Sequence, residues 1–462
     1  MTALPRLRRR VGVGLAALLL SARCLGSADD RIADLLTVYE RARTEDPTFQ
    51  AAIATLEAAR QKKPEAFSAL LPSLAATGSR GETHGSTLYT GTPRVTRSFQ
   101  AHDWALELRQ PLFRATNLEA YAEAKLQVEQ AVAQYAVAEQ DLVLRVARAY
   151  FDVLIAHDVL DASEAQVHAL AEQSAAAARS FKAGVGSITD QDDAESRLAL
   201  AEAQREQARA DLLGRRAALE ALAGPIDTAL APMTADAMLP APEPPDLSTW
   251  LTRAVAESPA VLAAEAAKGV AEHEIARNRA QRYPTVDLSA NLGANYSSGN
   301  ITNPFNYATD VRDKQLSLQV TVPLLDGGGI HAQVLEALAN RHRATAELEA
   351  AKRQARIDTT TSYAALTGGL AQVRALRTAV AAGERAVKGS QASYRVGIRI
   401  NSDVLIAEQH LFESRRDYAR ARYDTVYAGL KLKAVSGLLT RGDIASTNRL
   451  LESVGSGDTP SP

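Results

Sequence analysis

Few residues in this sequence have the types and spacing that catalysis or metal binding requires. The eight histidines are scattered, with no HisGluXXHis motif and no pair four residues apart, so no metal site is predicted. Gly327-Gly328-Gly329 stands between a strand pattern and a helix pattern, as a phosphate loop would, but no GlyLysSer/Thr follows. No GlyXSerXGly occurs, and Cys24 is the only cysteine. The sequence therefore predicts neither an enzyme nor a bound cofactor.

Between 283 and 329, polar and apolar residues alternate on both sides of a polar loop. Val286, Leu288 and Leu292 fall on the apolar side before the loop, and the alternation resumes after it. A period of two predicts β-strands, and two such strands around a loop predict a hairpin. The polar side includes Asp287, Asn291, Asn295, Gln315 and Gln319. This pattern fits a half-buried sheet in water or a membrane barrel with a polar lumen.

Prolines at one spacing indicate an internal duplication. Pro47 and Pro259, Pro72 and Pro284, and Pro111 and Pro323 are each 212 residues apart. A weaker strand pattern at about 72–112 is thus the counterpart of the hairpin at about 284–323. The predicted junctions between strands and helices are Pro72, Pro111, Pro284, Pro323, Gly327 and Gly328.

Two very long helices follow the hairpins. The stretch from about 115 to 182 contains no proline or glycine, which predicts a helix on the order of 100 Å long. Its apolar residues recur every seven positions, which predicts coiled-coil packing. These residues are Tyr121, Val128, Tyr135, Leu142 and Ala149, with Val132, Val146 and Val153 at the other seam position. The second long helix, about 330–394, contains Gly368-Gly369 as a candidate kink.

The predicted organisation is two repeats, each with a helix, a hairpin, a long helix, a tip turn and a return helix. The fold class is therefore mainly α, with four β-strands per chain. The predicted segments are a signal peptide at 1–28, repeat one at 29–223, a proline-rich linker at 224–246, repeat two at 247–440 and a flexible tail at 441–462.

Composition and charge narrow the function further. Arginines before an apolar run predict a secretory signal peptide, cleaved after Ala28 or alternatively after Ala22. The formal net charge is −2, and loss of the arginine-rich leader makes it more negative, so nucleic-acid binding has no electrostatic support. No later run of about 18 apolar residues exists, so no transmembrane helix is predicted.

Four strands are too few for a membrane barrel, since even small ones need about eight. Open sheet edges in lipid would leave backbone groups unsatisfied, so strands of several chains would have to join. The alternative is a soluble four-stranded sheet capped by helices. The signal peptide and the long helical hairpins favour the shared membrane barrel.

The sequence resembles the TolC-type outer-membrane channels of Gram-negative export systems across essentially the whole mature chain. The resemblance rests on the tandem repeat, ProLeuLeuAspGlyGly at 323–328, and the tip turns IleThrAsp at 188–190 and TyrArgValGlyIleArg at 394–399. It implies a homotrimer with a 12-stranded barrel in outer-membrane lipid and a helical tunnel across the periplasm. The implied partners are a periplasmic adaptor and an inner-membrane transporter. For the transporter, an ABC type is the first choice and a proton-driven pump the second.

The resemblance also implies a periplasmic gate between neighbouring tip helices. Thr189 and Asp190 match the hydrogen-bond acceptors of the first repeat, and Tyr394 and Arg399 match the donors of the second. A solvated bridge of this kind contributes no more than about 1 kcal/mol, so docking energy would suffice to release it.

Two further sets of tip residues follow from the same resemblance. Asp403 matches the first of two pore-facing aspartates, whereas Ile406 replaces the second, so the ring is weaker here or rests partly on Glu408. The adaptor and transporter docking tip is Gly184, Val185, Gly186, Val396 and Gly397.

Each of these residues also has a plainer interpretation. Asp190 could be a helix N-cap beside Thr189, Arg399 could be a solvated charge, and the glycine turns could serve only to reverse the chain. Trp104 and Tyr296 fit either an aromatic belt or ordinary strand positions.

Three functions are therefore compared. The first is an outer-membrane export channel. Type I protein secretion is the preferred pathway for it, and small-molecule efflux is the alternative. The second is a periplasmic adaptor, for which a compact lipoyl-like module is missing. The third is a periplasmic enzyme or scaffold.

Overall fold

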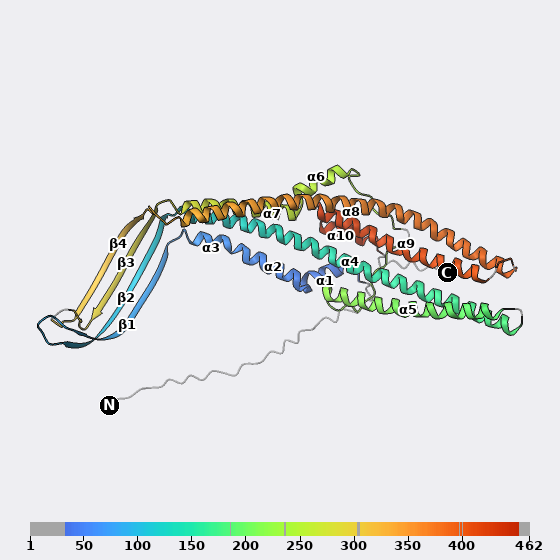
Figure 1. Cartoon of the computed structure of the whole chain (residues 1–462), viewed down its shortest axis with the longest axis horizontal. Coiled ribbons are helices and arrows are strands. Elements are labelled where there is room, and N and C mark those ends of the chain that lie inside the picture. Colours follow the sequence, from blue (N-terminus) through green and yellow to red (C-terminus); the bar gives the residue numbers. More distant parts are fainter. Residues whose placement is uncertain are drawn as a thin grey trace, which may run out of the picture.

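The computed structural model describes residues 33–184, 186–234, 237–302, 305–396, 398–399 and 401–451. The predicted signal peptide and the segment 452–462 lie outside them. The molecule is elongated, with a four-stranded sheet at one end and long helices over the rest of its length (Figure 1). The predicted fold class, mainly helical with four strands in two repeats, is confirmed.

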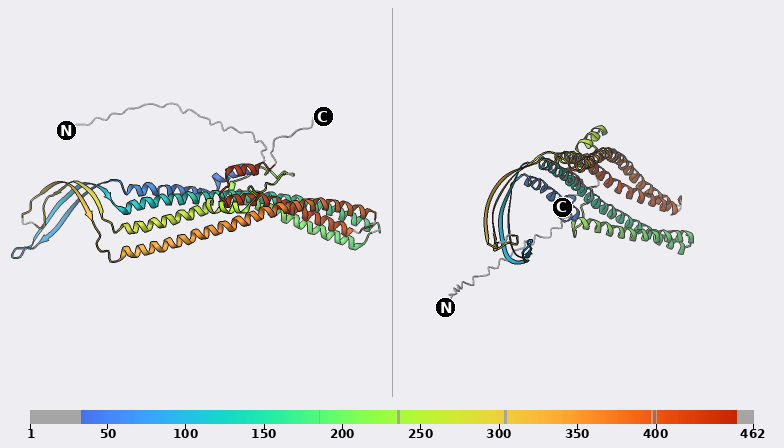
Figure 2. Two further views of the ribbon diagram at one scale, coloured as in Figure 1. Left: turned by 90° about the horizontal axis from the view of Figure 1, so that it is seen from above. Right: turned by 60° about the vertical axis from the view of Figure 1, so that its left-hand side comes forward.

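The sheet is antiparallel with the strand order β1-β2-β3-β4. Its strands are β1 (Ser73–Thr87), β2 (Val95–Phe113), β3 (Thr285–Ser297) and β4 (Thr309–Thr321). Leu106 pairs with Leu292, which pairs with Lys314, so even-numbered residues of the four strands share one face. The sheet is curved rather than flat (Figure 2). β1 and β4 are its two unpaired edges.

The helices fall into two similar sets, one on each side of the linker. The first set is α1 (Leu35–Glu45), α2 (Pro47–Arg60), α3 (Lys62–Ser68), α4 (Ala115–Lys182) and α5 (Ile188–Ala223). The second set is α6 (Leu247–Glu257), α7 (Pro259–Ala280), α8 (Gly329–Arg395), α9 (Asn401–Val435) and α10 (Arg441–Asn448). Pro47 and Pro259 stand at the first turns of α2 and α7, where a missing N–H costs nothing.

The long helices follow the sequence pattern closely but not completely. Leu142, Val146 and Val153 of α4 are buried, whereas the predicted seam residue Val132 is 47% exposed. α8 continues through Gly368-Gly369 without a break. A Cβ on Gly369 would lie 2.5 Å from the Thr425 hydroxyl, so this glycine allows close packing of α8 on α9. Within the described residues, no helix is both long and apolar enough to cross a membrane.

The main core lies at the middle of the molecule, where α1, α4, α5, α9 and the linker meet. Tyr150 is fully buried there, and its hydroxyl donates to the carbonyl oxygens of Ala231 (2.9 Å) and Ala33 (3.2 Å). The linker is thus part of the core. The tail predicted as flexible from 441 begins instead with α10, because Thr440 and Asp443 form a capping box and Ile444 is buried.

Candidate functional site

Two helical hairpins end in tips at the extremity opposite the sheet. α4 and α5 form one hairpin, and α8 and α9 form the other (Figure 1). The two tips are separate ends in this view. All predicted gate and docking residues lie at or near them, so the tips are the candidate functional site.

The α4–α5 tip reverses the chain over residues 183–187. Gly184 has φ +71°, and its N–H donates to the Phe181 carbonyl at 2.9 Å. Gly186 donates to the Ser180 carbonyl at 3.1 Å, which closes the turn. Both glycines thus have a turn-forming role, and Val185 between them lies outside the described residues.

The N-cap of α5 is Ser187, not Asp190. The Ser187 hydroxyl accepts from the Thr189 N–H at 3.2 Å and lies 2.7 Å from the Thr189 hydroxyl. Asp190 lies in the first turn, where a carboxylate is favoured by the helix dipole. It is exposed and forms no ion pair with any described residue. The N-cap interpretation of Asp190 is therefore wrong, and its carboxylate is available to another chain.

The α8–α9 tip folds Arg399 back onto its own hairpin. The Arg399 guanidinium donates to the buried Ser390 hydroxyl at 3.2 Å, and the Ile398 N–H donates to the Ser393 carbonyl at 3.0 Å. Val396 is 70% exposed. Gly397 lies outside the described residues.

The four predicted gate residues do not meet within one chain. Among the described residues, no hydrogen bond or ion pair joins Thr189 or Asp190 to Tyr394 or Arg399. The structure thus shows no bridge between Asp190 and Arg399 within the described residues of one chain. The predicted gate therefore stays a prediction.

The structure adds a contact that sequence reasoning missed, centred on Glu408 of α9. The Gln173 amide of α4 donates to both Glu408 oxygens at 3.2 Å, and the Gln391 amide of α8 donates to one of them at 3.1 Å. We call these three residues the amide clamp. Burial raises the pKa of Glu408, against the hydrogen bond from Gln391. Tyr394 lines the same hollow. Glu408 is thus held between helices within one chain, and the expectation that a pore-facing ring rests partly on it stays a prediction.

The clamp belongs to a partly polar contact between the two hairpins. Gln166 of α4 donates to Gln409 of α9 at 2.8 Å, one heptad away from Gln173. Apolar packing beside them is limited to a small cluster containing Leu170 and Leu405. Exposure to water costs hydrogen-bonded amides less free energy than it costs apolar side chains, because water replaces their hydrogen bonds. This contact therefore allows the two hairpins to separate at a small free-energy cost. The two glutamines spaced by seven were the available signal.

Asp403 and Ile406 lie near the start of α9 on adjacent turns. Asp403 is half-buried in the first turn, and Ile406 is 48% exposed. The departure from paired aspartates is thus a real change of surface, with an aliphatic side chain where a second charge was expected.

The strand–helix junctions are held by polar contacts. Pro72, Pro111, Pro284 and Pro323 all lie within or beside strand ends. Gly327 and Gly328 have φ +67° and +90°, and Asp326 accepts from the N–H groups of Gly328 (3.2 Å) and Ile330 (2.6 Å). Those glycines thus form the turn into α8.

A charged cluster lies where the sheet meets α4, with the nearly buried Asp287 carboxylate at its centre and two partly exposed arginines around it. Its carboxylate accepts from Arg114 at 2.9 and 2.5 Å and from Arg109 at 3.2 Å. Asp287 belongs to β3, Arg109 to β2, and Arg114 precedes α4. The cluster ties the sheet to the first long helix.

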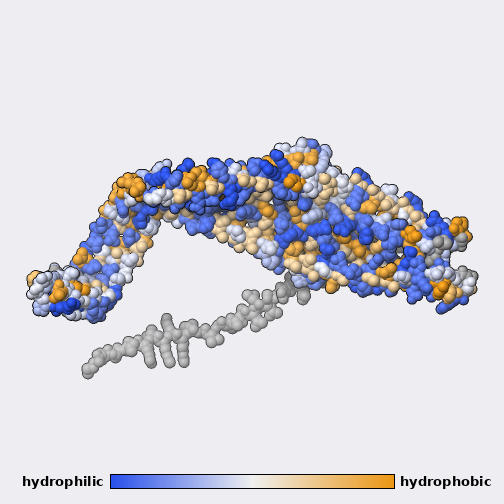
Figure 3. All heavy atoms as spheres, in the orientation of Figure 1, coloured by the Kyte–Doolittle hydropathy of each residue, from blue (hydrophilic) through white to orange (hydrophobic). Residues whose placement is uncertain are grey.

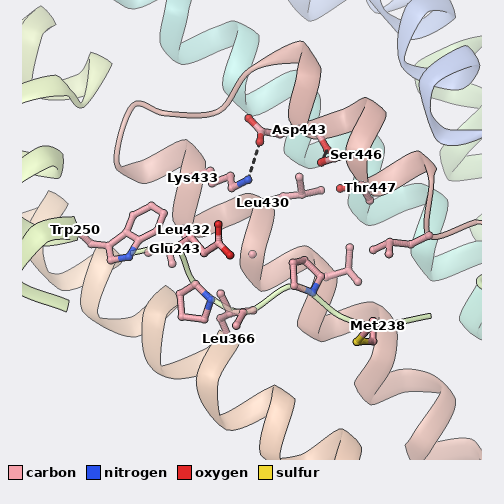
Figure 4. Close-up of a pocket in the computed structure, with 16 residues that line it drawn as sticks. Met238, Glu243, Trp250, Leu366, Leu430, Leu432, Lys433, Asp443, Ser446 and Thr447 are labelled. Carbon is pink, nitrogen blue, oxygen red and sulfur yellow. Dashed lines mark hydrogen bonds and ion pairs between the residues drawn. The ribbon is translucent and has the colours of Figure 1, made fainter. Parts of the chain in front are cut away.

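A hollow lies under the linker, lined by residues of the linker, α6, α8, α9 and α10 (Figure 4). Lys433 pairs with Asp443 inside it at 2.7 Å, and the Trp250 ring N–H donates to the Pro244 carbonyl at 2.8 Å. These polar groups are already paired with one another. Within the described ranges, no cluster of three potential metal ligands is found.

Comparisons with known proteins agree with this geometry. The sequence matches the family described as "Outer membrane efflux protein" over residues 38–225 and 250–438. It is 30% identical over 418 residues to the "Alkaline protease secretion protein AprF" of Pseudomonas aeruginosa, covering 89% of this chain and 85% of that protein. It is 29% identical over 435 residues to the "Proteases secretion protein PrtF" of Dickeya chrysanthemi, covering 93% of each. The crystal structure of the outer membrane protein VceC from Vibrio cholerae superimposes with a TM-score of 0.72 at 20% identity, covering 87% of this chain and 96% of that one.

Proposed function

The chain belongs to the outer membrane efflux protein family, and we propose that it is the outer-membrane channel of a type I protein secretion system. At the level of the family, it is an outer-membrane efflux or secretion channel whose helices extend into the periplasm. The observation that carries the finer proposal is that AprF and PrtF, both named for protease secretion, match both repeats over most of their lengths.

The shape of one chain supports an assembly of three. The sheet has two open edges, an exposed apolar face and a polar face, so it needs other copies to close in lipid. Three copies would supply 12 strands, enough for a barrel with a wet lumen. The helices of the three copies would then form a tunnel. A periplasmic adaptor and an inner-membrane transporter, ATP-driven in this proposal, would dock at the tips around Gly184, Val185, Gly186, Val396 and Gly397.

The gate would lie between chains at these tips. Asp190 and Thr189 of one chain would face Arg399 and Tyr394 of the next, with Asp403 toward the pore. The amide clamp would hold the two hairpins of each chain together. This division fits the structure, because the clamp is formed within one chain and the Asp190 carboxylate is left exposed.

Secretion of a protein cargo would test the pathway directly. The chain is expressed with the transporter, adaptor and secreted protein of its own source organism in a host that lacks channels of this family. We expect the cargo protein outside the cell only when this chain, the transporter and the adaptor are all present. Export of a fluorescent dye with the cargo retained in the cell would favour the small-molecule efflux alternative. Recovery of the chain in the soluble periplasmic fraction would contradict both.

Loss of the inter-chain gate contacts should open the tunnel. We expect Arg399→Ser and Tyr394→Phe each to raise the single-channel conductance in planar lipid bilayers, because each removes a hydrogen-bond donor from the proposed contact. Arg343→Ser, which removes an exposed i,i+4 pair with Glu347 on α8, is the control and should leave conductance unchanged. Unchanged conductance in both tip variants would remove these residues from the gate.

A further inference from the structure

We propose that the outer face of the sheet carries a binding site for the phosphate groups of outer-leaflet lipids, formed by Arg80, Arg312 and Lys314 beside Trp104 and Tyr296. We call these five residues the collar. The proposal rests on the proposed insertion of the sheet into the outer membrane and goes beyond it by naming a lipid chemistry.

The face that carries the collar is the one suited to lipid. Even-numbered residues of the four strands share it, and near the helices they are aliphatic and exposed. Leu316 is 73% exposed, Leu318 61% and Leu74 69%. β3 continues this band from Val286 to Ala294, roughly 27 Å along the strand. For a tilted strand this approaches the apolar band of about 25 Å in membrane barrels.

On the same face, aliphatic residues give way to basic and aromatic residues in the half of the strands farther from the helices. On β4, Lys314 and Arg312 follow directly beyond Leu316. On β1, Arg80 follows Gly78, and on β2 and β3 the aromatic residues Trp104 and Tyr296 occupy the corresponding region. Aromatic side chains gather at membrane interfaces, so their presence marks the level of the lipid headgroups.

The aromatic residues lie on the outer surface rather than in a core. Trp104 is 47% exposed, and the Tyr296 ring stacks on His102 with the centroids 4.8 Å apart. Figure 3 shows hydrophilic residues over much of the sheet in the view drawn, while apolar residues gather at the bend between sheet and helices. Trp104 and Tyr296 therefore occupy positions that an aromatic belt would use, and the belt is part of this proposal.

The basic residues of the collar are largely without partners. Neither Arg80 nor Lys314 forms an ion pair with a described residue. Arg312 is 82% exposed and has only a long contact of 3.7 Å with Asp310. Glu82, the next acid on this face, lies farther along β1 and contacts His84 and Ser98. The collar therefore keeps a positive excess.

The two faces of the sheet differ in their balance of charge, although the outer face also carries the acids Glu82 and Asp310. The inner face at the same end carries the acids Asp103, Glu107 and Asp313, which alternate with the outer positions. An excess of positive groups facing lipid, with acids at the same end of the lumen face, would attract anions mainly at the outer surface. Closure of the sheet would also join β4 to β1 of the neighbouring chain, which brings the edges that carry Arg312, Lys314 and Arg80 to one seam.

Phosphate on a lipid fits this surface better than free phosphate. Arginine and lysine bind phosphate oxygens with charge-assisted hydrogen bonds, and side chains of this length reach from the edge of an apolar band to the headgroups. The continuous apolar band below the collar would hold the acyl chains of the same molecule.

The test compares lipid binding by the purified assembly in neutral detergent, measured by native mass spectrometry. The probes are diphosphorylated lipid A, its dephosphorylated form, and inorganic phosphate as competitor. We expect Arg80→Ser/Arg312→Ser/Lys314→Ser to bind the diphosphorylated lipid on the order of 100-fold more weakly, roughly fivefold for each charge removed. The matched control Asp103→Asn/Asp313→Asn removes charges from the inner face at the same end and should change binding less than twofold.

The proposal would be overturned if the wild type bound the two lipid forms equally or if the triple variant bound as tightly as the wild type. Displacement of the lipid by millimolar inorganic phosphate would also overturn it. If the triple variant fails to assemble, Arg312→Ser alone decides, since this exposed side chain contributes little to the fold. A wild-type chain that does not enter membranes would refute the proposed function as well. A chain that inserts and conducts but ignores the lipid phosphates would refute this inference alone.

Discussion

Asp287→Asn is expected to lower the free energy of unfolding of the assembled protein by about 2–3 kcal/mol. The Asp287 carboxylate is 10% exposed and accepts three hydrogen bonds from Arg109 and Arg114. Asparagine keeps the size of the side chain but removes its charge. The two guanidinium groups would then repel each other without a counter-ion. The cost stays below that of a fully buried pair, because Arg109 is 53% exposed and is screened by solvent.

The loss would be measured by urea titration in detergent micelles, with helical circular dichroism as the signal. Asp313→Asn is the control, because Asp313 lies on the same face of the sheet but is exposed and accepts a single amide hydrogen bond from Asn291 at 3.1 Å. It should change the unfolding free energy by less than about 0.5 kcal/mol.

A double-mutant cycle separates the charge from the shape of the cluster. Arg114→Gln combined with Asp287→Asn leaves Arg109 as the remaining charge, so the double variant should be more stable than the sum of the single losses implies. Strictly additive losses would show that the Asp287–Arg114 contact contributes nothing of its own.

The sequence predicted the large elements because their signals are local and repeated. Helix α4 lacks proline and glycine, the strands alternate over many residues, and Pro72 and Pro284 show the duplication. The prediction of a flexible tail from 441 was wrong at α10. The segment is short and polar, and the capping box of Thr440 and Asp443 that starts this helix was not recognised in the sequence. The Asp287 cluster could not be predicted, because Arg109, Arg114 and Asp287 meet only once two distant repeats share one sheet.

The candidate site was predictable only in part for the same reason. The turns near Thr189, Asp190, Tyr394 and Arg399 are present, but the contacts that we propose for these residues lie between chains and cannot be read from the fold of one chain. The amide clamp has little local signature beyond the seven-residue spacing of Gln166 and Gln173, because its three members come from three helices.

Glu408→Ala is expected to raise the open fraction of the channel on the order of tenfold at neutral pH. Removing the carboxylate leaves the Gln173 and Gln391 amides without their shared acceptor, and an unsatisfied buried amide costs about 1–3 kcal/mol. The penalty falls on the packed state of the two hairpins, whereas water satisfies both amides once the hairpins separate. Single-channel recording in planar bilayers would detect the change.

Glu408→Gln separates the hydrogen bonds of the clamp from its charge. A glutamine at this position still accepts from Gln173 or Gln391, and its amide donates to the buried Gln173 carbonyl oxygen, which has no partner among the described residues. The variant should therefore conduct like the wild type at neutral pH. An opening as large as that of Glu408→Ala would mean that the charge, rather than the hydrogen bonds, closes the contact.

The pH dependence supplies the sharpest distinction between these variants. Burial raises the pKa of Glu408 in the packed state, so that state binds a proton more readily than the separated state, in which water surrounds the carboxyl. Packing is consequently favoured as the pH falls from neutral through the raised pKa toward the ordinary glutamate range, and the wild-type open fraction should fall with it. Glu172 and Tyr394 line the same hollow, but neither accepts a hydrogen bond from the clamp amides. Glu408→Gln should remove this part of the pH dependence. Glu413→Gln, which alters the neighbouring contacts with Gln409 and His410 and leaves the clamp in place, should retain it. A wild-type channel that opens on acidification, or a Glu408→Gln channel with an unchanged pH profile, would contradict a proton-sensitive clamp.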